Sequence, residues 1–192
     1  MTDALKDIFG GDTDHKEAHT VASKIATLVG SRVVSNEEIV LGMPYCLFKV
    51  SLHTKQFHCF IFISDASYCF RAKAKPKTPW VSDFSISLKE PDPVGGARVF
   101  APDLSKMIGV KVYCLPRCPA DAVDIAFSTS MVGLLRQIQF NRVRAFHFTP
   151  VRLDVVASLD TPEFCVSQAS IFRDLLTLAN QEAYERNKEV LG

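Results

Sequence analysis

Residues 45–77 decide the fold of this chain and read YCLFKVSLHTKQFHCFIFISDASYCFRAKAKPK. From Cys46 to Leu52 apolar side chains occupy every second position. Because successive side chains of a strand point to opposite faces of a sheet, this alternation predicts a half-buried strand. Polar gaps over 53–56 and 64–66 divide the stretch into three strands. The simplest topology for them is a consecutive antiparallel meander over 45–74.

The middle strand of this meander is apolar on both faces. One face carries four apolar side chains, namely Phe57, Cys59, Ile61 and Ile63. Phe60 and Phe62 lie on the other face, where the neighbouring strands contribute Lys49, Arg71 and Lys73. Such a strand is covered on both sides within a sheet, or it presents its second face to a partner. We therefore take Phe60 and Phe62 as candidate binding residues.

Helices and further strands surround the meander. Apolar spacing predicts helices near 15–29, 130–140 and 161–190, and Asp160, Thr161 and Pro162 form a typical start for the last one. Alternation predicts strands near 33–41, 81–88, 110–115 and 144–157, with a turn or bulge at the polar centre of the first. The predicted fold class is α+β, a mainly antiparallel sheet with the three main helices packed on one face.

The length and composition are those of an ordinary globular domain. The chain has 192 residues, of which 47% are hydrophobic and 22% charged. We therefore expect a single domain over 1–192 and no disorder. The strongest break is the loop 90–96, Glu-Pro-Asp-Pro-Val-Gly-Gly, which is either a long surface loop or a division between two halves.

Charge and cysteine content restrict the expected ligands and cellular location of the protein. The formal net charge is +1, so any binding of a polyanion must depend on a local patch. The six cysteines lie at 46, 59, 69, 114, 118 and 165, three of them within predicted strands. The sequence shows no signal peptide and no apolar run of the roughly 18 residues that a membrane span needs. We expect free thiols and a cytoplasmic location.

A basic run follows the meander and allows two interpretations. Arg71, Lys73, Lys75 and Lys77 recur at every second position, and Trp80 follows them. The run could contact phosphate or nucleic acid, with Trp80 available for stacking on a base. It could equally protect an exposed edge strand against self-association. The low net charge favours the protective interpretation.

Two weaker patterns could carry chemistry. His15 and His19 are four residues apart on a predicted helix and could share a metal ion, but no third ligand is evident. Cys114 and Cys118 lack a second pair of ligands, although Cys118, beside Arg117, could be a reactive thiol. Solvated histidines and buried thiols are the commoner explanations. No nucleophile elbow, phosphate loop or dinucleotide motif is present, so we predict no cofactor.

Three functional hypotheses remain. The first is a non-catalytic protein–protein interaction module of the adaptor, inhibitor, immunity or chaperone type. It would use the apolar sheet face or the closing helix, where Leu176 and Tyr184 lie off the apolar stripe, and it includes self-association. The second is a nucleic-acid or phosphate-ligand binding protein that uses residues 71–80. The third is a thiol- or metal-dependent enzyme.

Overall fold

The computed structural model describes residues 12–40, 43–64, 67–75, 86–88, 99–114 and 128–191. In these residues the strands form one sheet in the order β1-β2-β3-β4-β9-β8-β5-β7-β6, and every neighbouring pair is antiparallel. The strands are β1 (Val33–Val40), β2 (Met43–Ser51), β3 (Phe57–Ile63), β4 (Ser67–Ala74), β5 (Ile86–Ser87), β6 (Val99–Phe100), β7 (Tyr113–Cys114), β8 (Val143–Thr149) and β9 (Arg152–Ser158). The helices are α1 (Asp12–Leu28), α2 (Pro102–Ile108), α4 (Thr129–Gln137) and α5 (Pro162–Leu191), with a 3-10 turn at Phe140–Arg142. The predicted α+β class is confirmed.

The predicted meander is present as β2, β3 and β4. Val50 pairs with Ile61, which pairs in turn with Phe70, so the three apolar side chains form one row on the same face. β1 adds to the edge of β2, and its register shifts between Ser35 and Glu38. This irregularity falls at the polar centre where a turn or bulge was predicted.

A second hairpin, β8–β9, completes the middle of the sheet. It matches the hairpin predicted over 144–157, with its turn at residues 150–151. β9 pairs along β4, and Phe70 lies opposite Val155. β4 is therefore an interior strand, and the interpretation of Arg71 and Lys73 as guards of an exposed edge is wrong.

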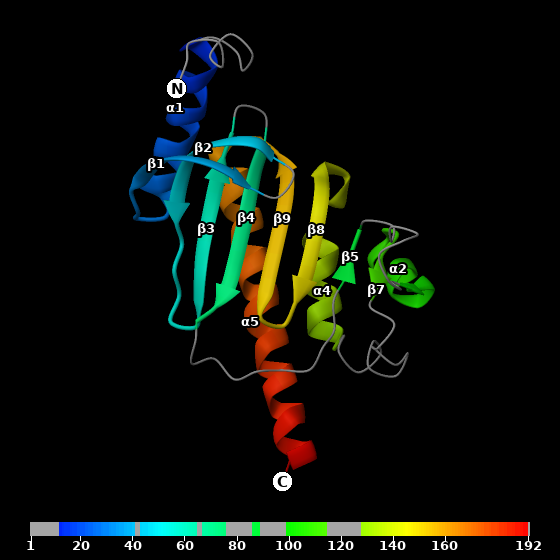
Figure 1. The fold of residues 1–192 in the computed structure, drawn as a ribbon. Helices are drawn as coiled ribbons and strands as arrows, with labels where there is room; N and C mark the ends of the chain where they lie inside the picture. Colours follow the sequence, from blue (N-terminus) through cyan, green and yellow to red (C-terminus); the bar gives the residue numbers. More distant parts are fainter. Residues whose placement is uncertain are drawn as a thin grey trace.

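Three helices cover one face of the sheet, as predicted. α5 runs behind β4 and β9, α4 lies behind β8, and α1 packs against β2 and α5 (Figure 1). Phe70 and Phe172 meet between sheet and helix with ring centroids 5.5 Å apart, and both rings are fully buried. Burying one such side chain contributes about 1.5–3 kcal/mol. Leu176 was expected off the apolar stripe but is fully buried in this core, while the side chain of Tyr184 lies outside the described residues.

The helix ends follow the capping residues in the sequence. Thr161 precedes α5, and its Oγ1 accepts a hydrogen bond from the N–H of Phe164 at 3.3 Å. Ser128 caps α4 in the same way through the N–H of Met131. Gly109 ends α2 with a φ of 77°, which is the left-handed conformation that glycine adopts most readily.

The strands predicted near 81–88 and 110–115 are shorter in the described residues. They comprise Ile86–Ser87 and Tyr113–Cys114. Residues 81–85 and 115 lie outside the described ranges, whereas 110–112 are described and are not part of a strand, so the prediction that the strand begins at 110 is wrong. The loop 90–96 also lies outside them. Within the described part of the chain, no helix combines the length and the apolar character that a bilayer crossing requires.

We predict that Gln168→Ala lowers the free energy of unfolding by about 1–2 kcal/mol. The buried Gln168 side chain accepts a hydrogen bond from the N–H of Gln139 at 3.2 Å and donates one to the carbonyl of Gln137 at 3.5 Å. It therefore joins the end of α4 to α5. Urea unfolding would measure the loss. Gln137→Ala removes an exposed amide of the same size and should change stability by less than about 0.5 kcal/mol; equal losses for the two variants would refute this role of Gln168.

Candidate functional site on the outer face of the sheet

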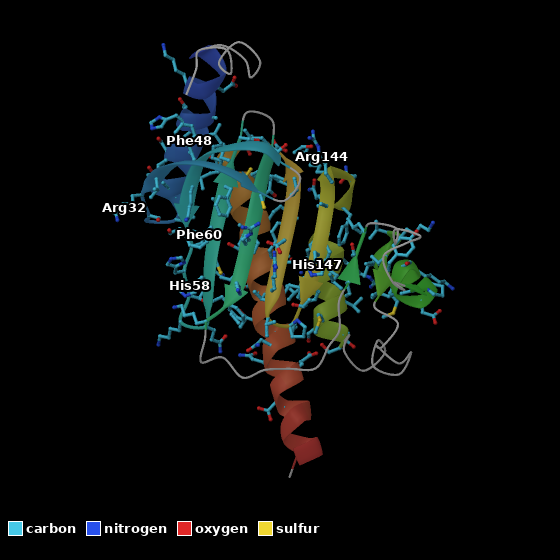
Figure 2. All side chains as sticks on the ribbon, in the orientation of Figure 1. Arg32, Phe48, His58, Phe60, Arg144 and His147 are labelled. Atoms are coloured by element: carbon cyan, nitrogen blue, oxygen red, sulfur yellow. The ribbon has the colours of Figure 1, made fainter. Side chains whose placement is uncertain are left out.

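The face of the sheet opposite α1, α4 and α5, here the outer face, carries a mostly polar row of side chains across six strands, here the polar row. The strand registers align six side chains, namely Ser51, Phe60, Arg71, Asp154, His147 and Ser87. Figure 2 shows Phe60 and His58 on β3, and His147 and Arg144 on β8. Residues that face each other across neighbouring strands are close enough to interact directly. This row is therefore one continuous surface built from distant parts of the sequence.

Asp154 is the centre of the charge network on this face. Its side chain is only 4% exposed. Arg71 Nε donates to Asp154 Oδ1 at 2.9 Å, and Arg152 Nε donates to the second carboxylate oxygen. A buried carboxylate with two guanidinium partners is well compensated, because both its oxygens accept charge-assisted hydrogen bonds.

Cationic side chains outnumber acidic ones on the outer face. At its described positions in β2, β3, β4, β8 and β9 the cations are Lys49, Arg71, Lys73, Arg144 and Arg152, and the one carboxylate is Asp154. Arg144 reaches this face through a hydrogen bond of 3.4 Å from its guanidinium to Ser67 Oγ. The charge of the whole chain is only +1. Among the described side chains of these five strands, positive charge therefore exceeds negative charge on the outer face.

The two candidate phenylalanines differ in exposure. Phe62 is 3% exposed and belongs to a small cluster with Cys69 and Val156, so it offers little surface to a partner. Phe60 is half-buried, with its ring centroid 5.8 Å from that of Phe62. The ammonium of Lys49 lies 4.2 Å from the Phe60 centroid, a cation–π contact. The apolar part of the accessible outer face is therefore centred on Phe60.

The residues of the basic run do not all lie on the same surface in the structure. Arg71 and Lys73 share the outer face, as their alternation predicted. Lys75 turns to the β2–β3 hairpin, where its backbone N–H and its ammonium donate to the carbonyls of Gln56 and Thr54. Lys77 and Trp80 lie outside the described residues.

Sequence reasoning missed the contribution of β9 to this face. Arg152 and Asp154 alternate with buried Leu153 and Val155, which is a visible signal of an amphipathic strand. The alternation does not reveal which strand β9 pairs with. The charges of β9 could therefore not be placed beside Arg71 before the structure was known.

His53 borders the outer face without adding charge to it. Its ring lies edge-on to Phe60, with centroids 4.7 Å apart, and its Nδ1 accepts a hydrogen bond from the N–H of Cys59 at 3.2 Å. Burial, followed by the nearby His58 and Lys75, lowers the pKa of His53. The lowered pKa favours the neutral form of the His53 ring.

The described thiols are poor nucleophiles. Cys59, Cys69 and Cys165 are fully buried. Burial raises the pKa of Cys59 to about 11, against a smaller opposing effect of Arg173, and it raises the pKa of Cys165 to about 12. These two thiols remain protonated at neutral pH. Cys118 lies outside the described residues.

The histidine pair of α1 gains no further ligand in the described part of the chain. The ring of His19 packs edge-on against Phe48 with centroids 5.1 Å apart, while the side chain of His15 is outside the described set. Among the described residues, no three His, Cys, Asp or Glu side chains are grouped so that they could hold a metal ion.

Comparison with known proteins shows a similarity of fold but no similarity of sequence that identifies a family. No protein-family model matches the chain, and no curated protein sequence matches it. The crystal structure of the mycobacterial trehalose monomycolate transport factor A, TtfA, is similar with a TM-score of 0.56. The match covers 85% of this chain and 96% of TtfA at 12% sequence identity. At this identity the likeness concerns the fold and carries over no residue.

We predict that Arg71→Ala and Asp154→Ala are energetically coupled. Each variant should lose about 1–3 kcal/mol of unfolding free energy, and the double variant should lose less than their sum by about 1 kcal/mol. A double-mutant cycle in urea measures the coupling. The exposed pair Arg173–Asp174 is the control and should couple by less than about 0.5 kcal/mol. Additive losses at Arg71 and Asp154 would contradict the described network.

Stability should fall as the pH rises above 9. An unfolded cysteine has a pKa near 9.0, whereas folded Cys59 has a pKa of about 11 and folded Cys165 of about 12. Between these values the unfolded chain loses a proton that the folded chain retains, so the free energy of unfolding falls by at most about 1.4 kcal/mol per pH unit for each thiol. Urea unfolding under reducing conditions from pH 7 to 11 would show this slope. Cys59→Ala should make the slope shallower, and an unchanged slope would contradict the assignment to this thiol.

Proposed function

We propose that this chain is a non-catalytic binding protein that holds an acidic segment of a partner protein on the outer face of its sheet. The observation that carries the proposal is the group of five cationic side chains around the single described carboxylate of that face. Complementary charge speeds association with acidic partners and disfavours basic ones.

The geometry suits recognition of a surface or an extended segment. The cations are mounted on paired strands about 4.8 Å apart, so their spacing is fixed by the backbone ladder. Arg71 and Arg152 are already oriented by Asp154, and they lose little freedom when an acidic group reaches them. Phe60 adds an apolar contact between Lys49 and Arg71. Arginine and aromatic side chains are enriched in protein interfaces.

The aromatic residues of the face favour a protein partner over nucleic acid. Single-stranded nucleic acid binds on open aromatic rings that stack with the bases. The Phe62 ring is buried, and the Phe60 ring has Lys49 against it. The net charge of +1 is also small for a nucleic-acid binding domain. These features support the first sequence-based hypothesis, with the positive face in place of an apolar one.

The similar fold of TtfA is compatible with a binding role. That protein is described as a trehalose monomycolate transport factor. The likeness supports the use of this sheet-and-helix fold in handling another molecule. It does not favour any particular partner, because 12% identity transfers no site.

The proposal predicts that reversing two outer-face charges weakens the binding of acidic peptides. Fluorescein-labelled peptides rich in Asp and Glu would be titrated with the folded protein at low salt, and anisotropy recorded. Lys49→Glu with Lys73→Glu should weaken binding about tenfold or more. Lys16→Glu with Lys106→Glu makes the same change of net charge at exposed helix positions and should stay within about twofold. Equal weakening by both pairs would reject the outer face as the site.

Asp154→Asn provides the opposite test on the same face. It removes the central negative charge and leaves a side chain of similar shape, so an acidic peptide should bind more tightly. A mixed-sequence single-stranded oligonucleotide, matched to the peptide in charge, serves as the competing ligand. If the protein binds the oligonucleotide more tightly than the peptide at the same salt concentration, the nucleic-acid alternative is favoured and the proposal of a protein partner is rejected.

A further inference from the structure

A cavity lies between α1, α5 and the β2–β3 hairpin, and one of its lining residues, His53, also contacts Phe60 of the polar row. It has a volume of about 320 Å³ and is lined by the end of α1, the first half of α5 and the β2–β3 hairpin. Three separate parts of the fold thus meet around it. Its volume is within the range of sites that bind small molecules, at the lower end.

Part of the cavity lining is apolar. Phe70 and Leu52 come from the sheet, Val166 and Ala169 from α5, and Leu28 from the last turn of α1. Leu28 is 50% exposed, which is high for a leucine beside a core. A hydrocarbon group seated here would bury that side chain together with its own apolar surface.

The polar groups of the lining include one permanent charge. Arg173 of α5 lines the cavity, with Ser170 one helical turn before it and with His53 and Thr54 on the hairpin. Arg173 also pairs with its neighbour Asp174 at 3.0 Å, but both side chains are more than 40% exposed, and such exposed pairs are weak. The guanidinium can therefore exchange Asp174 for a ligand anion at little cost.

His53 contributes a donor and not a second charge. Its Nδ1 accepts the N–H of Cys59, so the neutral ring carries its proton on Nε2. One cation with neutral donors matches a singly charged anion better than a doubly charged phosphate. The planar guanidinium fits a carboxylate with two parallel hydrogen bonds.

We propose that this cavity binds a small monocarboxylic acid with an unbranched hydrocarbon body, with the carboxylate on Arg173 and the hydrocarbon against Leu52, Val166 and Leu28. A cavity of about 320 Å³ holds roughly ten non-hydrogen atoms if each takes about the 30 Å³ of a liquid water. Octanoate has this size and this chemistry. None of the charged side chains of the outer face lines this cavity, so either proposal can be correct without the other.

Isothermal titration calorimetry with octanoate and with octanol tests the site on the full chain. Octanoate should bind at a stoichiometry of one with a dissociation constant below about 1 mM, which about ten atoms can supply. Arg173→Gln should weaken octanoate about tenfold and leave octanol within about twofold. Arg32→Gln removes an equal charge from an exposed residue outside the cavity lining and should change neither ligand.

A second variant addresses the apolar part of the cavity. Ser170→Leu places a larger side chain in the lining, so it should weaken octanoate and octanol alike. The circular dichroism of each variant shows whether it is folded. Absence of saturable octanoate binding to the folded wild type would overturn the proposal. So would equal losses for Arg173→Gln and Arg32→Gln, or octanoate binding unaffected by Ser170→Leu.

Discussion

β4 and β9 are separated by some eighty residues of sequence and lie side by side from Ser67 opposite Ser158 to Lys73 opposite Arg152. This pairing joins the meander to the second hairpin. Bringing such distant segments together costs loop entropy, and the cost must be offset by contacts that only the paired strands make. On the helix side those contacts are apolar, with Phe70 opposite Val155 and packed on Phe172 of α5. The core therefore determines which strands become neighbours.

The outer face is a consequence of the same pairing. Because side chains alternate along each strand, the register that buries Phe70 and Val155 also places Arg71 opposite Asp154. A shift of one residue would expose the apolar set and bury the charges. The apolar core thus fixes the geometry of the polar row without any contribution from a ligand. A binding surface of this kind is preorganised by folding, which lowers the entropy lost on binding.

Local patterns in the sequence predicted most of the main helices and strands, but they could not predict which distant strands pair with each other. The alternation from Cys46 to Ala74 predicted β2, β3 and β4, and Thr161 and Pro162 predicted the start of α5. These features depend on residues within a few positions of each other. The position of β9 depends on contacts across the whole chain. One of the two interpretations of the basic run therefore placed Arg71 and Lys73 at an edge, whereas they lie inside the sheet. Phe62 and Leu176 were expected at surfaces but are buried. The sequence pattern indicates on which side of a strand or helix a side chain lies, but it does not indicate which other elements cover that side.

The central claim is that strands β3, β4 and β9 together form one surface for acidic partners. Mapping of backbone amide chemical shifts during titration with an Asp- and Glu-rich peptide tests it most directly. We expect the largest shifts to fall on β3, β4 and β9 around Phe60, Arg71 and Arg152, and to saturate together. Shifts centred on α1 and α5, or spread evenly over all exposed lysines and arginines, would contradict it.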